Sequence, residues 1–572
     1  MADQYSDPVT RRNRYSKLQG QLWTDRSSFD AHWRDLGDFF QPRRMRWSAS
    51  DRNRGDKRNQ NIINSTGRYA ARTLQSGLHA GLTSPARPWM KLTIPDQDLS
   101  EFGAVREWLH VVTTRMMTIL GVSNVYNVLP TVYGDLGVFG TAAMFLGDDP
   151  QDLARATAYP IGSYALGTDA RGVVSTFVRE YELTVRQVIE LFGLKENGRD
   201  IDWSNLSKTV KHLWDSGDYE STVEVCWLVK PNEEHRRDRL EARFLPFASC
   251  HWEKGSSEAQ FLRESGFRNF PIMAPRWDIT GEDSYGTDCP GMTSLGDNKQ
   301  LQIMERRHGQ ALNKMVDPPL VGPTSMRTQK TSLLAGDVNY VDVREGMQSL
   351  RAVHEIRIDL SHLGENIRAV EQRINRAFFA DLFLMMANSD PYRGASPTTA
   401  REIEERHEEK LLALGPVLER TNDELLDPLV DRLFNMMDNA GLLPPPPPEI
   451  EGADLKVEYI SILAQAQKLV GVAATDRFVG TIAPMLEVFP EMRNKIDSNR
   501  VVNGYADMLG IDPRIIISDE QADAATAAQQ QQQAGAAQAE QAALVAKSAK
   551  DASQAQLGTN SALDRVVEGF GG

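Results

Sequence analysis

Apolar side chains recur at helical spacing along several long segments of this chain. In residues 8–40 the repeated positions are Leu18, Leu22, Phe29, Trp33, Leu36 and Phe40. From Ile62 to Leu82 they are Ala70, Leu74, Leu78 and Leu82, and Pro85 prevents this helix from continuing. A third face follows the capping-box pattern Asp98-Leu-Ser-Glu101 and comprises Phe102, Val105, Trp108, Leu109, Val112, Met116 and Ile119. The spacing predicts a helix in each segment.

Shorter apolar runs, typical of strands, follow these helices. They lie at Trp89–Pro95 and at residues 173–183, 221–229 and 240–248. Thr184 precedes a short helical pattern, VRQVIELF, that Gly193 ends. Glycines in residues 132–146 indicate a change from helix to strand or close packing. Residues 1–275 are therefore predicted to form an α+β domain with antiparallel strands.

Two long helices are predicted on either side of a β-like insert. The first runs from Gly291 to Val316, where Pro318-Pro319 ends the pattern. The second has a narrow apolar stripe suited to packing on a neighbouring helix, made of Leu360, Leu363, Ile367, Val370, Ile374 and Phe378. The β-like pieces between them are 320–321, 338–343 and 350–358. Turn-forming residues at 387–397 then end the second helix, and a third, charged helix is expected from Thr398 to Asn439.

The C-terminal part of the chain differs in composition. Five prolines at 444–448 predict a stiff, extended boundary. A strand is expected at Leu455–Tyr459, with small helices after it up to residue 518. In residues 521–556, 25 of 36 are alanine or glutamine, so this tail has high helix propensity but few large apolar groups to bury. Both a disordered tail and a helix that packs against copies of itself fit this composition.

Charge is distributed unevenly along the 572 residues. Residues 1–95 hold 17 lysines and arginines against 8 acidic residues, a net charge of +9, whereas the whole chain carries −14 and the remainder therefore −23. Basic ends often contact nucleic acid or an acidic partner. We favour a solvated helix surface and loop over contact with DNA for these arginines, which are Arg11, Arg12, Arg14, Arg43, Arg44, Arg46, Arg52, Arg54 and Arg58. Both readings stay open.

The sequence carries no recognisable catalytic motif. It has no phosphate-binding G-x-x-x-x-G-K-[ST], no H-E-x-x-H and no G-x-S-x-G. The three cysteines form no C-x-x-C pair, and Cys250-His251 lacks further ligands at metal spacing, so we interpret it as an ordinary strand pair. No run of about 18 apolar residues is present, and no membrane segment or export signal is expected.

One acidic cluster could imitate a two-metal nuclease site. It consists of Glu402, Glu404, Glu405, Glu408 and Glu409. On a helix these side chains spread around the circumference and alternate with basic residues, and we therefore favour a solvated or salt-bridged helix.

Several blocks taken together resemble the portal, or head-to-tail connector, proteins of short-tailed bacteriophages. The blocks are Ser76–Leu92, Phe139-Gly140-Thr141, Thr184–Gly193, Pro275-Arg276-Trp277 with Tyr285-Gly286, and Thr399-Ala400-Arg401-Glu402-Ile403. No block is specific alone, but their order and spacing between about residues 10 and 520 are.

The resemblance implies a mainly helical α+β portal fold that assembles as a ring, usually of twelve copies. By position, the expected parts are a wing at 1–290 and 398–460, stem helices at 291–317 and 358–386, a clip at 318–357, a tunnel loop at 387–397, a crown at 461–518, and a barrel-like or disordered tail at 519–572. It also implies a location at the capsid vertex of the virion, after assembly in the host cytoplasm.

The implied function is non-enzymatic: a DNA conduit for packaging and ejection, without cofactor or metal. The implied partners are copies of the chain, double-stranded DNA, the terminase large subunit, a tail adaptor or head-completion protein, and the major capsid protein with its scaffold. Tunnel-loop candidates for touching DNA are Asn388, Ser389, Asp390, Tyr392 and Arg393. Stem and clip candidates are Arg327, Lys330, Arg344, Arg368 and Arg376. Inter-subunit salt bridges are the alternative role for these cations.

Charge agrees with a conduit. A row of phosphate-neutralising cations would bind DNA tightly through counterion release and stall its movement. A chain of net charge −14, repeated around a ring, repels the duplex on average, and sparse cations can still position it. The alternatives are a capsid or tail protein without a channel and, on the acidic cluster, a DNA-processing nuclease.

Overall fold

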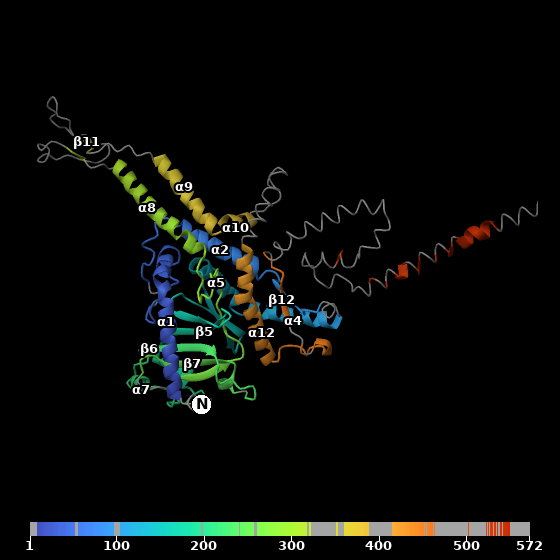
Figure 1. Ribbon diagram of the computed structural model, residues 1–572, viewed down its shortest axis with the longest axis horizontal. Helices are drawn as coiled ribbons and strands as arrows, with labels where there is room; N and C mark the ends of the chain where they lie inside the picture. Colours follow the sequence, from blue (N-terminus) through green and yellow to red (C-terminus); the bar gives the residue numbers. More distant parts are fainter. Residues whose placement is uncertain are drawn as a thin grey trace, which may run out of the picture. The chain divides into compact units, whose positions relative to one another are not determined.

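The structure is a computed structural model that describes residues 8–51, 55–96, 103–195, 198–239, 241–256, 260–316, 320–321, 351–352, 360–387, 414–450, 452, 455–461, 463 and 501–502, with helical pieces between 522 and 548 (Figure 1). Two compact units are present. The main unit comprises 1–93, 108–446 and 454–467, and the second comprises 94–107, 447–453 and 468–572. Mixed helices and antiparallel strands confirm the predicted α+β class.

A five-stranded antiparallel sheet forms the largest β element of the main unit. Its strands are β4 (Tyr164–Thr168), β5 (Val174–Thr184), β6 (Thr222–Pro231), β7 (Phe247–Glu253) and β8 (Arg263–Phe267), each paired with the next along the chain. The predicted strands at 173–183 and 221–229 are confirmed. The third prediction, 240–248, was wrong in its start, because Ala242–Phe244 is a 3-10 turn and β7 begins at Phe247.

Helix α1 (Pro8–Phe39) lies across one face of this sheet (Figure 1). Its Tyr15 and Leu22 are buried with Val178 of β5 and Leu228 of β6. On the opposite face, Val223 and Val225 of β6 pack with α6 (Val185–Val188) and α7 (Lys208–Asp215). Thr184 caps α6 with a complete capping box, as the sequence predicts.

Three arginines of α1 are buried and are not part of a solvated surface. Arg11 is 5% exposed and its Nη2 lies 2.9 Å from Glu264 Oε1, while Arg12 donates to the Glu253 carbonyl oxygen at 3.0 Å. Arg26 is 2% exposed and donates to the Gly162 and Tyr164 carbonyl oxygens. The solvated interpretation is therefore wrong for Arg11 and Arg12, whose guanidinium groups contact residues on distant strands. Arg26, which that interpretation did not include, is buried in the same way.

A smaller antiparallel sheet packs beside the first. It contains β3 (Leu153–Tyr159), β2 (Ala143–Asp149) and β9 (Ile272–Met273), in that order. Phe145 of β2 lies edge-on to Trp227 of β6, with ring centroids 5.0 Å apart. Helix α5 (Val125–Phe139) leads into β2 through Gly140, whose φ of +74° is the left-handed conformation that the predicted helix-to-strand change requires.

The remaining helices of the main unit surround α2 (Thr66–Leu82). It begins four residues later than predicted, and Ala70, Leu74, Leu78 and Leu82 are buried as expected. It packs against α5, and it also contacts α9 (Leu360–Ala377) and α10 (Ala380–Ala387). Strand β1 (Met90–Thr93) pairs antiparallel with β12 (Lys456–Tyr459), which confirms both predicted strands.

The predicted third helix is described from Leu414 to Asn439. A π-helical turn at Asn422–Leu426 interrupts it before α12 (Asp427–Asn439). The acidic residues 402–409 lie outside the described residues. In the second unit, α4 (Gly103–Val122) begins and continues into the main unit, and residues 541–548 are helical with Leu544 and Val545 exposed.

His251 lies in strand β7, as the sequence predicts, and has no metal-ligand neighbours among the described residues. Its ring stacks on Trp227 with centroids 5.4 Å apart. Burial, aided by Arg263, lowers the pKa of His251 to about 3. The neutral imidazole is thus the form that the sheet accommodates.

This burial predicts acid sensitivity. The pKa of His251 in the folded state lies below the unfolded value of about 6.5. The free energy of unfolding is therefore unaffected by this histidine above pH 6.5 and decreases as the pH falls from 6.5 towards 3. At pH 5 His251 is protonated in the unfolded state and still neutral in the folded state. This difference should lower the free energy of unfolding by about 2 kcal/mol, at about 1.4 kcal/mol per pH unit below 6.5. The melting temperature of a His251→Phe variant should fall less between pH 7 and pH 5 than that of the wild type. His32→Gln, at an exposed position on α1, is the control and should match the wild type; equal losses in all three proteins would refute the prediction.

Candidate functional site

Three segments from two of the quoted sequence blocks meet where helix α8 (Pro290–Val316) begins. Trp277 N–H donates to the Gly140 carbonyl oxygen at 2.9 Å, and Gly286 N–H donates to Thr141 Oγ1 at 2.8 Å. Tyr285 Oη accepts from Leu166 N–H at 2.8 Å. We call this meeting of 139–141, 275–277 and 285–286 the hub. It fixes the chain that enters α8 to both sheets.

Arg276 is the charged centre of the hub and is 3% exposed. It donates to Glu424 in the π-helical turn, with Nε 3.1 Å from Oε1, and the Arg276 backbone N–H donates to Oε2 at 2.8 Å. The guanidinium group also donates to the Asp283 carbonyl oxygen at 2.7 Å and the Gly172 carbonyl oxygen at 3.0 Å. One side chain therefore joins β-sheet loops to the helix that returns from residue 414. Glu424 has no signal in the sequence, because its partner is 148 positions away.

Gly286 approaches the backbone of Gly140 too closely for any side chain. A Cβ added there would lie 2.0 Å from the Gly140 carbonyl oxygen. We expect Gly286→Ala to destabilise the protein by about 1–3 kcal/mol, because the backbone must move and the hydrogen bond to Thr141 is strained. Gly281→Ala is the control, since no atom lies within 4 Å of its added Cβ. Melting curves of both variants test this, and equal stability of the two would contradict it.

Helices α8 and α9 run side by side away from the sheets (Figure 1). The predicted stripe of α9 is confirmed at Ile367, Val370, Ile374 and Phe378, all buried. Arg373 Nη2 of α9 lies 2.8 Å from Asp297 Oδ1 of α8. Beyond them, Leu320–Val321 pairs antiparallel with Arg351–Ala352, in agreement with β-like structure at these ends of the insert.

Asn64, in the loop before α2, joins both helices to the body of the main unit. Its Nδ2 donates to Glu305 Oε1 of α8 and to Glu371 Oε1 of α9, each at 2.9 Å. Gln302 of α8 accepts from Ile63 N–H and Asn64 N–H at 2.7 and 2.8 Å. The helix pair is thus attached to α2 by amide and carboxylate groups.

The predicted second helix is not continuous. It breaks between α9 and α10 at Phe379, whose φ of +52° is uncommon for a bulky residue. Phe378 packs on Phe40, the residue after α1, and the ring centroids of Phe379 and Trp277 are 6.5 Å apart. The break therefore contacts both the hub and the end of α1. No glycine or proline stands at the break, so the sequence pattern does not predict it.

The two ends of α8 differ in exposure. Its N-terminal half is buried at Ser294, Leu295, Asn298 and Leu301. Its C-terminal half leaves four large apolar side chains exposed, namely Ile303, Leu312, Met315 and Val316, with exposed fractions of 53, 46, 45 and 78%. Within the described part of one chain, this apolar surface has no cover.

The predicted DNA contacts are only partly described. Arg368 and Arg376 are exposed on α9. The other clip candidates, Arg327, Lys330 and Arg344, lie outside the described residues, as do Asn388, Ser389, Asp390, Tyr392 and Arg393 of the proposed tunnel loop.

A family model for bacteriophage head-to-tail connecting proteins matches residues 12–517. The chain belongs to that family. The match spans the hub, the α8–α9 pair and the returning helix, and it ends before the helical residues 541–548.

Two curated relatives match almost end to end. The portal protein of Salmonella phage epsilon15 is 42% identical over 562 residues, covering 98% of this chain and 99% of that protein. A probable portal protein of Bordetella phage BPP-1 is 40% identical over 569 residues, with the same coverage of each. A solved gene transfer agent particle neck is 12% identical, covering 77% of this chain and 94% of its own, and its TM-score of 0.35 does not establish a shared fold.

Two further searches of the described residues were negative. No described helix is both long and apolar enough to cross a lipid bilayer. No group of three or more histidine, cysteine, aspartate or glutamate residues in the described part could hold a metal ion.

Proposed function

We propose that this chain is a phage portal protein, which forms the ring-shaped DNA channel at the capsid vertex and conducts the genome during packaging and ejection. The observation that carries this proposal is family membership over residues 12–517, together with near full-length similarity to two portal proteins. The protein acts as a structural conduit, and ATP hydrolysis belongs to the terminase that docks on it before a tail adaptor does.

The exposed apolar half of α8 supports assembly into a ring. Leu312, Met315 and Val316 are spaced three and four positions apart on the helix and therefore share one face, and exposed apolar patches on a protein surface mark sites that bind a partner. Ile303, Leu312, Met315 and Val316 lie on the segment assigned to the first stem helix, where adjacent copies would meet. A closed ring covers this surface on every copy, because each subunit offers one face to the next. Twelve copies is the number that we propose.

The finer division follows the helix pair. We assign 291–317 and 358–386 to the stem, 318–357 to the clip that docks terminase and then the adaptor, and 387–397 to the tunnel loop. Residues 1–290 and 398–460 form the wing, 461–518 the crown, and 519–572 its extension. The position of the α8–α9 pair, anchored by the hub and Asn64 at one end, supports this division.

Electrostatics supports weak rather than tight contact with DNA. Arg373 already pairs with Asp297, so it adds little net positive charge to the helix pair. Arg368 and Arg376 are exposed and available either to a neighbouring copy or to phosphates. Together with the net charge of −14, this pattern suits a channel that positions a duplex without holding it. The virion is where the ring works, after assembly in the host cytoplasm with capsid protein and scaffold.

Negative-stain electron microscopy of the purified full chain tests the proposal. We expect rings with a central hole. Closed particles or monomers would instead support a capsid or tail protein without a channel.

A point variant links the rings to α8. Val316→Asp, which places a charge on the most exposed of the four apolar side chains, should reduce ring formation. Val173→Asp is the matched control, because Val173 is 50% exposed but lies in the β4–β5 turn region outside the stem. Rings that form equally well in both variants would show that α8 is not the contact.

A further inference from the structure

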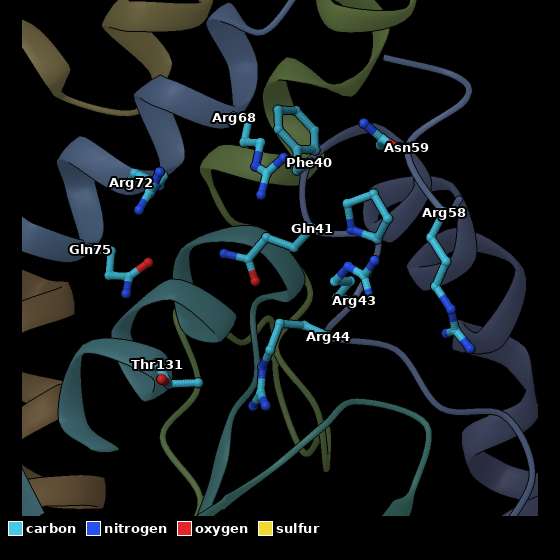
Figure 2. Close-up of a pocket in the computed structure, with 11 residues that line it drawn as sticks. Phe40, Gln41, Arg43, Arg44, Arg58, Asn59, Arg68, Arg72, Gln75 and Thr131 are labelled. Carbon is cyan, nitrogen blue, oxygen red and sulfur yellow. The ribbon is translucent and has the colours of Figure 1, made fainter. Parts of the chain in front are cut away.

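A cavity of about 350 Å³ lies between α2, the loop after α1 and the middle of α5 (Figure 2). Its described lining contains five arginines and no aspartate or glutamate. The arginines are Arg43, Arg44, Arg58, Arg68 and Arg72. Positive charges gathered around one cavity repel one another unless negative groups neutralise them.

Three of the five arginines already have acceptors. Arg44 forms a bidentate ion pair with the buried Asp135, with Nε 2.9 Å from Oδ1. Arg58 pairs with Asp51, and Arg43 Nη2 donates to the Asp56 carbonyl oxygen at 3.3 Å. These contacts stabilise the loop after α1, which forms one wall of the cavity.

Arg68 and Arg72 differ from the other three. They are exposed on one face of α2, and neither makes a hydrogen bond or ion pair with any residue that the structure describes. Being four positions apart on a helix, they are neighbours of like charge, an arrangement that is destabilising by itself. Figure 2 shows both side chains on α2 at the edge of the cavity, with Arg68 extending towards Gln41.

We propose that this cavity binds a phosphate group between Arg68 and Arg72. Guanidinium groups present planar pairs of donors that match phosphate oxygens, and such charge-assisted pairs are among the strongest hydrogen bonds in proteins. Asn59 and Gln75 on the rim add neutral side-chain amides that can donate. The cavity volume lies at the lower end of that of small-ligand sites, roughly 300 to 1,000 Å³, which suits a small anion.

The phosphate has two possible sources with the same chemistry. It is either a free phosphate anion or a phosphate of the DNA backbone, which can reach Arg68 and Arg72 because both are exposed. The site does not rest on the proposed channel role, since none of its residues is assigned to stem, clip or tunnel loop.

Two measurements on the purified full chain separate the sources. The first is binding of a fluorescent 20-base-pair duplex at several salt concentrations. The second is the rise in melting temperature caused by inorganic pyrophosphate at constant ionic strength. Each is made on the wild type, on Arg68→Gln/Arg72→Gln, and on Arg171→Gln. The last is the control, because Arg171 is 82% exposed and pairs with Asp169 in a turn outside the cavity.

If DNA is the source, the slope of log affinity against log salt should fall in magnitude by about 1 in the double variant, because the one lost phosphate contact removes about 0.9. If a free anion is the source, pyrophosphate should protect the wild type and Arg171→Gln but not the double variant. An Arg68→Lys/Arg72→Lys variant should restore part of either effect, since it keeps the charge but not the planar donors.

No difference between the double variant and Arg171→Gln in both measurements would overturn the proposal. So would loss of rings in the double variant with DNA slope and pyrophosphate protection unchanged, because the arginines would then face a carboxylate of a neighbouring copy. Should the double variant not fold, the single variants Arg68→Gln and Arg72→Gln replace it, and in each the slope should change by less than about 1, because the remaining arginine still contacts the phosphate.

Discussion

Arg276→Ala should unfold at a melting temperature several degrees below that of the wild type. Removing one member of a buried ion pair costs about 3–5 kcal/mol, because the remaining charge stays buried without its partner. Here Glu424 would keep only the backbone N–H of residue 276, at 2.8 Å. The carbonyl oxygens of Asp283 and Gly172 would also lose their donor. Since the hub fixes the start of α8, the variant should also form fewer rings.

The chain offers a matched control for this variant. Arg420, on the same returning helix, pairs with Asp278 at 3.0 Å, but the two side chains are 27 and 55% exposed. Exposed pairs contribute about 0–1 kcal/mol, so Arg420→Ala should lower the melting temperature little. A similar loss in both variants would contradict the importance of the buried pair.

A second variant separates charge from packing. Arg276→Met/Glu424→Leu removes both charges, and replacing a whole buried pair by apolar residues is often neutral. Recovery should be partial, because the Asp283 and Gly172 carbonyl oxygens still lack a donor. Full recovery would mean that the carbonyl contacts of Arg276 contribute nothing.

The periodic elements could be predicted from the sequence, and the contacts between distant segments could not. Helix α1 and the buried stripe of α9 follow from spacings that only a helix satisfies. Strands β2, β3 and β4 carry alanine, glycine and threonine in place of a clear apolar alternation, so they were not predicted individually.

The same limit applies to charged residues. A sequence displays Arg11, Arg12 and Arg26 as surface cations because their partners stand on strands far along the chain. The block Pro275-Arg276-Trp277 could be recognised by resemblance, yet the reason for its arginine, Glu424 in a π-helical turn, needs the folded chain. The break at Phe379 likewise depends on contacts between distant segments, because Phe378 packs on Phe40 and Phe379 packs near Trp277.

Deleting residues 388–396 should yield particles that contain rings but package or retain far less DNA. We proposed above that these residues belong to the tunnel loop, the narrowest point of the channel. Their side chains are small or polar, with Arg393 as the one cation among them, so they can guide a duplex without neutralising many phosphates. Removing them widens or reshapes the constriction, and the genome is then moved or held less effectively.

Rings should survive this deletion because the contacts that hold the helix pair lie elsewhere. Asn64 still joins Glu305 and Glu371, Arg373 still pairs with Asp297, and the exposed half of α8 is unchanged. Residues 397–413 also remain after the deletion, and they still connect Ala387 to Leu414.

A length-matched control distinguishes loop chemistry from chain length. Replacing 388–396 by nine glycine and serine residues keeps the connection but removes Asp390, Tyr392 and Arg393. If side-chain contact with DNA matters, this variant should package as poorly as the deletion, whereas a requirement for length alone would leave it normal. Genome copies per purified particle measure the effect, and ring counts by microscopy verify assembly. Normal genome content in the deletion particles would refute a role for this loop, because a constriction that acts on DNA cannot lose its side chains and keep its function.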